Sequence, residues 1–218
     1  MNLVTTETTL VLAGAWNGAI LTPDWILRHG LGKSREEAQG AVVQVELPAG
    51  PFGALESPRF TLEGFTYVAR PDALILMPAA TDEQSLKLIE TCALGVLTTL
   101  KHTPIAGIGH NLEYASEDPA LHRPESFAQS QNDLLDVAPQ DWEAYKTVIA
   151  SQFNAGAAQV NVQRYADSQK MGIKFNFHHA ANNADDALKV LSGDGYNSFW
   201  QNFRIASELV TKLFGENQ

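Results

Sequence analysis

The residues best suited to chemistry in this sequence lie in one short stretch, Gly107–Glu113, which reads GIGHNLE. If the stretch is a strand, alternation puts Asn111 and Glu113 on one face with two glycines and puts His110 on the other face. Glycines leave a bare patch where a helix or a ligand can approach the backbone. His110 would then act as a base or ligand, while Asn111 and Glu113 orient a substrate. The other interpretation is that the glycines admit the helix expected after Thr81 and that His110 is a hydrogen-bonded core residue. The stretch is not a dinucleotide fingerprint, because the third glycine and the following helix are absent.

A second candidate is the pair His178–His179. Neighbouring strand residues point to opposite faces, so both rings cannot bind one metal ion without a bulge. His179 continues an apolar stripe, whereas His178 joins a polar face. One of the two could pair with His110 across the sheet and form a metal or acid–base site if Glu113 or Asp185 lies near. A structural or exposed role for the histidines is the alternative, and no metal or cofactor is expected.

Two tryptophans near the N-terminus suggest a third place to look. Trp16, Asn17 and Trp25 could line a ligand pocket or anchor an interface, or they could close one end of the core. Cys92 is the single cysteine, so an internal disulfide is excluded and a reducing, cytoplasmic setting is expected. No basic residue lies near Cys92 in the sequence to activate it as a nucleophile.

Charge argues against nucleic-acid binding. The chain carries 15 basic and 25 acidic residues, a net charge of −10. Eight acids and one base, Arg123, fall within residues 113–143, which leaves −3 for the rest. Three prolines interrupt this region, so residues 116–143 are expected to form a loose acidic connector able to dock a basic partner. No apolar run is long enough to cross a membrane.

The elements that must position these residues follow from hydrophobic periodicity and from capping residues. Strands are expected at Thr8–Trp16, Ala41–Gly50 and Ile105–Ala115, with hairpins near residues 59–80 and 160–179. Helices are expected from Thr22 to Gly30, from Thr81 to just before Pro104, after Asn183, and over Ser198–Phe214. In the second of these, Thr81 and Gln84 fit a capping box, Leu86, Ile89 and Val96 belong to one buried face, and Gly95 suggests close packing. In the last, the predicted apolar stripe consists of Phe199, Phe203, Ala206, Val210 and Leu213. This order predicts an α+β fold in which helices cover a mostly antiparallel sheet. We treat residues 1–218 as one domain. Two hairpin-plus-helix halves of similar plan, 1–115 and 144–218, are one arrangement that the order allows, but their sequence identity is too low to identify a repeat.

Two function classes remain open. The first is a non-catalytic, soluble intracellular interaction protein that binds a protein partner or itself, or serves as an accessory subunit of a bacterial or phage system. The alternative is a small-molecule-binding protein or hydrolase-type enzyme that uses Gly107–Glu113 with His110 and His178. The alternative requires that these histidines converge with Asn111 and Glu113 on one concave pocket.

Overall fold

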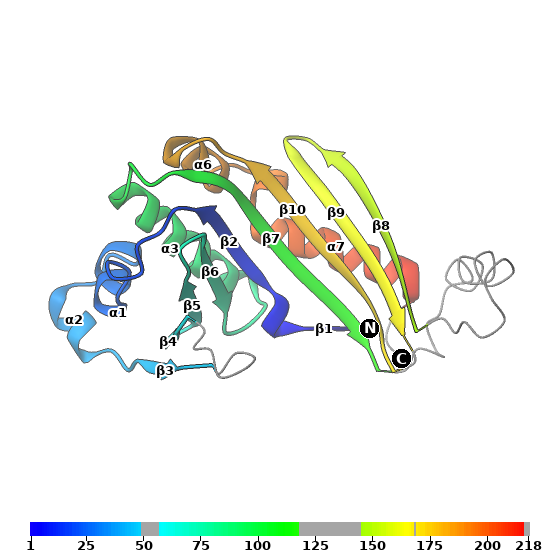
Figure 1. Cartoon of the computed structure of the whole chain (residues 1–218), viewed down its shortest axis with the longest axis horizontal. Coiled ribbons are helices and arrows are strands. Elements are labelled where there is room, and N and C mark those ends of the chain that lie inside the picture. The colour runs from blue at the N-terminus through cyan, green and yellow to red at the C-terminus, as the bar shows by residue number, and fades with distance from the viewer. Residues whose placement is uncertain (49–56, 118–144, 168, 216–218) are drawn as a thin grey trace, which may run out of the picture.

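The computed structural model describes residues 1–48, 57–117, 145–167 and 169–215. In these residues the strands form one ten-stranded antiparallel sheet. Three helices lie behind this sheet in Figure 1, namely α3 (Glu83–Thr99), α6 (Ala184–Leu191) and α7 (Phe199–Phe214). The expected α+β fold is therefore confirmed. The face turned toward the viewer in Figure 1 carries no helix over its central strands, and we call it the helix-free face.

The sheet is organised around two central strands that pair with each other, β2 and β7. The strands on one side are β1 (Asn2–Leu3), β2 (Thr9–Gly14), β3 (Gln44–Glu46), β4 (Arg59–Leu62), β5 (Phe65–Ala69) and β6 (Ala73–Pro78). The strands on the other side are β7 (Ile105–Ser116), β8 (Lys146–Ala155), β9 (Ala158–Asp167) and β10 (Met171–Ala180). Their order in the sheet is β3-β4-β5-β6-β2-β7-β10-β9-β8, with β1 beside β7. On each side of the β2–β7 pair, three or four consecutive strands return from the outside edge as a meander and helices follow; β7, which the predicted half 1–115 includes, lies beside the strands of the predicted half 144–218.

The core lies between the sheet and the helices. Strand alternation turns large apolar side chains such as Leu112, Phe175 and Phe177 toward the helices. The face predicted for α3 is buried, including Leu86, Ile89 and Val96. The stripe predicted for α7 is correct at Phe199, Ala206 and Val210 but wrong at its end, because Leu213 is 51% exposed.

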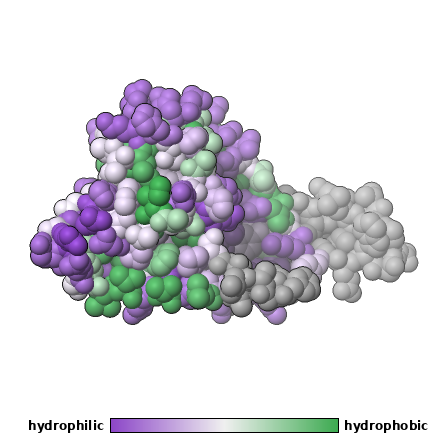
Figure 2. Space-filling model, turned by 60° about the vertical axis from the view of Figure 1, so that its left-hand side comes forward, coloured by the Kyte–Doolittle hydropathy of each residue, from purple (hydrophilic) through white to green (hydrophobic). Residues whose placement is uncertain are grey.

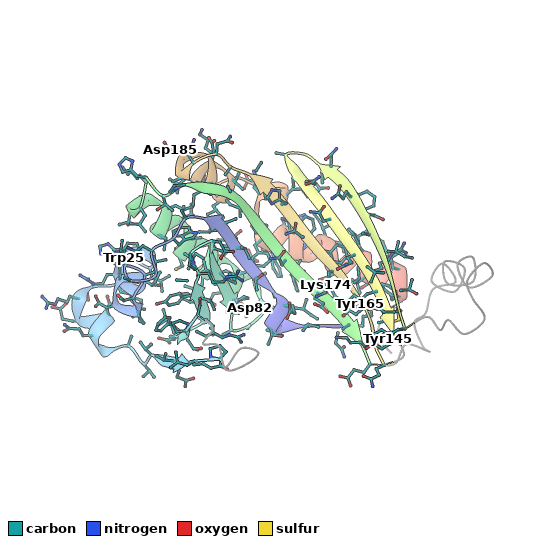
Figure 3. All side chains as sticks on the ribbon, viewed as in Figure 1. Trp25, Asp82, Tyr145, Tyr165, Lys174 and Asp185 are labelled. Carbon is teal, nitrogen blue, oxygen red and sulfur yellow. The ribbon has the colours of Figure 1, made fainter. Side chains whose placement is uncertain are left out.

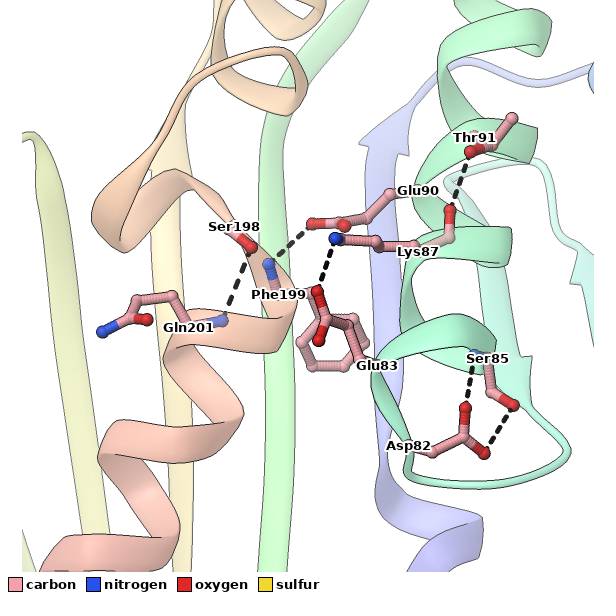
Figure 4. A network of polar contacts seen from close by, with 9 residues as sticks. All are labelled: Asp82, Glu83, Ser85, Lys87, Glu90, Thr91, Ser198, Phe199 and Gln201. Carbon is pink, nitrogen blue, oxygen red and sulfur yellow. Dashed lines mark hydrogen bonds and ion pairs between the residues drawn. The ribbon is translucent and has the colours of Figure 1, made fainter.

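Helix ends follow local hydrogen-bonding rules. Thr22 caps α1 (Pro23–Trp25), which continues as a π-helical turn, η2, over Ile26–Gly30. Asn183 caps α6 and Ser198 caps α7, as their positions in the sequence predict. The expected box of Thr81 with Gln84 is wrong: Asp82 caps α3 instead by accepting from the amide of Ser85 (Figure 4). A carboxylate has a full negative charge to offer the positive helix end, which favours Asp82 over the neighbouring threonine.

Three further elements differ from expectation. Helix α2 (Arg35–Gly40) begins with a complete capping box of Ser34 and Glu37 that the sequence analysis did not use. Strand β3 is shorter than the predicted Ala41–Gly50 strand, whose last residues lie outside the described part. Strand β8 was not predicted at all. The acidic connector, 116–143, lies almost entirely outside the described residues.

Candidate functional site

The sequence-predicted site residues are divided between the two faces of the sheet. His110 points toward the helices and is fully buried. Asn111 and Glu113 point to the helix-free face, and His178 lies on that same face. The structure therefore brings Asn111 near Glu113, whereas it separates His110 from His178 by the thickness of the sheet.

Side chains of β10, and not a helix, cover the glycine patch of β7. A Cβ atom built on Gly107 would lie 2.7 Å from Cε1 of His178. One built on Gly109 would lie 3.1 Å from Nδ2 of Asn176. The expectation that these glycines admit α3 is thus wrong, because α3 packs on the opposite face. The missing side chains instead leave room for polar groups from the neighbouring strand to lie flat on the sheet.

The central feature of the helix-free face is a row of hydrogen-bonded side chains across four strands, which we call the asparagine row. Asn161 on β9 donates from Nδ2 to Oδ1 of Asn176 on β10, at 3.0 Å. Asn176 donates in turn to Asn111 on β7 at 2.7 Å, and Asn111 donates to Oγ1 of Thr9 on β2 at 3.0 Å. The strand register makes the row, because these four residues are direct cross-strand neighbours. All three bonds run in one direction, so the row begins at Asn161 with an acceptor, Oδ1, that is buried and has no partner.

Glu113 is the centre of a charged cluster beside this row. Its two carboxylate oxygens are used separately: Tyr165 donates its hydroxyl to Oε1, and Nζ of Lys174 lies 2.7 Å from Oε2. Figure 3 places Tyr165 and Lys174 together at the same end of the sheet. Burial raises the pKa of Tyr165 strongly, and the hydrogen bond to Glu113 and its negative charge add to the shift. The phenol therefore stays protonated and acts as a hydrogen-bond donor.

The asparagine row and Glu113 line a shallow groove of about 320 Å³. The groove is bordered by Glu7, Thr9, Asn111, Leu112, Glu113, Asn161, Gln163, Lys174, Phe175 and Asn176. Eight of these ten residues are polar or charged. Phe175 and Leu112 belong to the strand positions that face the helices, so the groove offers polar groups to anything that enters it. Two of the predicted site residues, Asn111 and Glu113, thus share a concave site, and neither candidate histidine lines it.

His110 belongs to a different, buried cluster beneath the start of α7. Its ring stacks on Phe199 at a centroid distance of 4.8 Å and lies 5.6 Å from the ring of His179. Nδ2 of Asn202 lies 2.8 Å from Nδ1 of His110 and 2.7 Å from the carbonyl oxygen of Tyr196. Pairing of His110 with His179 is one of the arrangements considered from sequence, although Glu113 lies on the opposite face of the sheet from this pair.

The hydrogen bonds of Asn202 determine the tautomer of His110. The carbonyl of Tyr196 can only accept, so the nitrogen of Asn202 is its amide donor, and Nδ1 of His110 must accept from it. The proton of a neutral His110 ring then sits on Nε2, which has no partner in the described structure. A protonated Nε2 cannot bind a metal ion, and Nδ1 is already occupied. The arrangement therefore disfavours metal binding at His110, and no cluster of three potential metal ligands occurs among the described residues.

Burial determines the charge state of both histidines. It lowers the pKa of His110 to about 3, and the nearby ring of His179 adds to the effect. Burial also lowers the pKa of His179. The nearby backbone of Tyr196 opposes this shift, but neither ring nitrogen of His179 forms a hydrogen bond in the described structure. Both rings are neutral at physiological pH, so this cluster cannot supply a positive charge to a substrate.

The N-terminal tryptophans lie apart from the groove. Trp16 is buried in the core and donates from Nε1 to the carbonyl of Leu12 at 2.9 Å. Asn17 is exposed and accepts from the amide of Ala19, closing a local turn. Trp25 is half-buried, with its ring 4.8 Å from that of His29. Trp16 thus takes the place expected of a residue that closes the core, and none of these three residues borders the groove described above.

The second half of the sheet ends in a long edge strand, β8. Its ten residues pair with β9 in one unbroken register, from Lys146 with Asp167 to Ala155 with Ala158. No described residue pairs with its outer side. Val148 and Phe153 are 45% and 56% exposed. The sequence carries only a weak strand signal here, because the face with the apolar Ile149 and Phe153 also holds the polar Thr147 and Ser151.

A larger groove lies at the other end of the molecule, between η2, α2, β4 and the start of α3. It measures about 1660 Å³ and mixes apolar residues such as Leu31 and Leu88 with charged ones such as Lys33 and Asp82. β3 runs along the lower border of Figure 1, and an apolar patch follows that border in Figure 2. Val45 and the neighbouring Leu47 are among the most exposed apolar residues of the described chain. No sequence motif marked this groove.

No helix within the described residues is both long enough and apolar enough to cross a membrane. No family model, no curated protein and no solved structure matches this chain.

Proposed function

We propose that this protein is a binding protein that self-associates by pairing the β8 strands of two copies. The observation that carries the proposal is the contrast between the two edges of the sheet. β3 is three residues long and ends in Glu46, whereas β8 is ten residues long, has no proline or bulge, and carries one charge, Lys146. Short length, charge, proline and bulges are the devices that protect edge strands from pairing. β8 lacks them along most of its length, which supports a role for it as a pairing surface.

Hairpin geometry identifies the backbone groups that are available. Ala155 and Ala158 flank a two-residue turn that contains Gly156, so they form a hydrogen-bonded pair. Hydrogen-bonded pairs alternate with non-bonded pairs in an antiparallel ladder. The odd-numbered residues of β8 therefore bond to β9, and the even-numbered residues, Lys146 to Asn154, direct their N–H and C=O groups outward.

These outward groups suit an antiparallel two-fold pairing centred on Ala150. In that register Lys146 of one copy faces Asn154 of the other, and Val148 faces Gln152. The one charge on the strand then meets a neutral amide, and no like charges oppose each other. On the helix side, Phe153 would pack against Thr147 of the second copy, which covers an aromatic ring that is otherwise more than half exposed.

Light scattering coupled to size-exclusion chromatography tests the proposal. We expect a dimer that dissociates on dilution. Ala150→Pro removes one outward N–H without touching the bonds to β9, so it should give a folded monomer with an unchanged far-UV circular dichroism spectrum. Ala150→Thr keeps the N–H and is the matched control, which should remain dimeric. A wild-type protein that is monomeric over a wide concentration range, or an Ala150→Pro variant that still dimerises, would refute pairing through β8.

The same edge is available to a strand from a different protein, as the interpretation of an accessory subunit would require. A wild-type monomer would contradict self-association directly. The enzymatic alternative receives less support, because His110 and His178 lie on opposite faces and do not converge with Asn111 and Glu113.

A further inference from the structure

Apolar side chains at the β3 end of the sheet are exposed although one of them lies on the face that packs the core. Val45 is the direct cross-strand neighbour of Phe60, so both side chains point to the same face of the sheet. Phe60 packs against the core, whereas Val45 is 57% exposed. Val42, just before β3, is 78% exposed and lines the larger groove described above. Neighbouring exposed apolar side chains beside a groove indicate a surface that binds a partner.

The size and lining of this groove suit a segment of another protein. Its volume of about 1660 Å³ exceeds the roughly 300–1,000 Å³ of small-molecule sites. Its apolar lining includes the buried Leu27 and Leu62 and the half-buried Leu31 and Leu88. β4 already pairs with β3 on one side and with β5 on the other, so an extended segment would find no free backbone groups on it. A helix satisfies its own backbone hydrogen bonds and can place an apolar face on such a lining.

The charges that line the groove are mostly acidic. Glu83 forms an ion pair with Lys87. The other acids of the lining, Glu37, Glu63 and Asp82, are exposed and outnumber the one remaining lysine. Backbone amides at the starts of α2 and α3 donate to Glu37 and Asp82 and lower the pKa of both carboxyl groups, so both are charged at neutral pH. An apolar lining with an acidic excess is complementary to a segment that carries apolar and basic residues.

We propose that this groove binds a basic amphipathic helix of a different protein. The apolar face of that helix would contact Leu31, Leu88 and Val42. Its lysine or arginine side chains would lie toward Glu63 and Asp82. The groove and β8 belong to opposite ends of the strand order, so this inference goes beyond self-association and does not rest on it.

The direct test titrates the full chain into a fluorescein-labelled model peptide and follows fluorescence anisotropy. The peptide consists of leucine and lysine, ordered so that the leucines fall on one face of a helix. One comparison peptide has glutamate in place of every lysine, and a second has the same composition in an order that forms no apolar helix face. We expect saturable binding of the first peptide only. No binding of it, or equal binding of either comparison peptide, overturns the proposal.

Charge reversal then locates the binding, because a basic peptide is also attracted to the net negative charge of the whole chain. Glu63→Lys should weaken binding of the leucine–lysine peptide roughly threefold to tenfold. Glu208→Lys is the matched control: it makes the same change of charge at an exposed position of α7 that does not line the groove, and it should have a smaller effect. Equal effects of the two variants would show that the attraction is not specific to the groove and would overturn the proposal.

A second pair of variants tests the apolar contact. Val42→Ser should weaken binding roughly threefold to tenfold, whereas Leu209→Ser, on α7, should leave it unchanged. Both positions are exposed, so neither change opens a cavity in the core. Light scattering on Glu63→Lys identifies a different occupant: if this variant loses a dimer that the wild type forms, a second copy of the chain fills the groove and the proposal fails.

Discussion

The buried ring of His110 makes the protein sensitive to acid in a way that can be calculated. In the unfolded chain a histidine takes up a proton near pH 6.5, whereas burial in the fold lowers the pKa of His110 to about 3. Between these values the unfolded state binds more protons, so stability decreases as the pH falls. The stability that depends on a neutral His110 is fully present above pH 6.5 and is lost progressively as the pH falls toward 3. One proton of difference corresponds to about 2 kcal/mol at pH 5 and to at most about 5 kcal/mol near pH 3.

The variant His110→Gln isolates this contribution. Glutamine keeps an acceptor for Asn202 but does not titrate, so the variant should lose some stability at pH 7.5 and lose less on acidification than the wild type. Urea unfolding followed by tryptophan fluorescence at pH 7.5, 6.5, 5.5 and 5.0 gives the free energy of unfolding at each pH. The gap between the two proteins should narrow by about 2 kcal/mol between pH 7.5 and pH 5.

Other titrating groups do not disturb this comparison. Burial also raises the pKa of Glu90, which acts in the opposite direction, since a raised carboxyl pKa favours the folded state as the pH falls. That contribution is common to both proteins and cancels in the difference. His102→Gln changes an exposed histidine away from the cluster and serves as the control. Parallel pH profiles for the wild type and His110→Gln would refute the reasoning.

Two further predictions concern how the helices are held. Gly95→Ala should lower the free energy of unfolding in urea by about 1–3 kcal/mol, because the new Cβ would lie 2.3 Å from the carbonyl oxygen of Gly30 and η2 would have to move. Gly40→Ala is the control: its Cβ would meet nothing within 4 Å, so it should not lower the free energy of unfolding in this way. Glu90→Ala should cost about 1–3 kcal/mol, since Oε1 of Glu90 accepts the buried amide of Phe199 at 2.6 Å at the start of α7 (Figure 4). An unchanged urea midpoint in either variant would show that the contact does not contribute.

Local patterns were sufficient for most of the fold. The spacing of Leu86, Ile89 and Val96 identified α3, and the alternation in Gly107–Glu113 identified β7 and the face of each of its side chains. The closeness of Gly95 to a neighbouring element was also predicted correctly. These features depend on the period of a helix or strand and on short-range capping, which neighbouring residues in the chain determine.

Register and topology are decided by residues far apart in the chain. The asparagine row joins Thr9, Asn111, Asn161 and Asn176, which no sequence spacing relates, because cross-strand neighbours are set by turn lengths and by which strands share the sheet. Two other contacts likewise join residues far apart in the chain. Lys174 pairs with Glu113, and the carboxylate of Glu90 on α3 accepts from the amide of Phe199 at the start of α7.

The sequence by itself therefore determined most of the elements, although not α2 or β8, together with the faces of β7 and the residues that would be polar at its surface. Only the tertiary structure decided that His110 is a neutral core residue, that Asn111 and Glu113 share a groove, and that β8 is left at the edge of the sheet. The physical reason is that period and capping are local properties, whereas burial, pKa and strand neighbours depend on what the rest of the chain brings into contact.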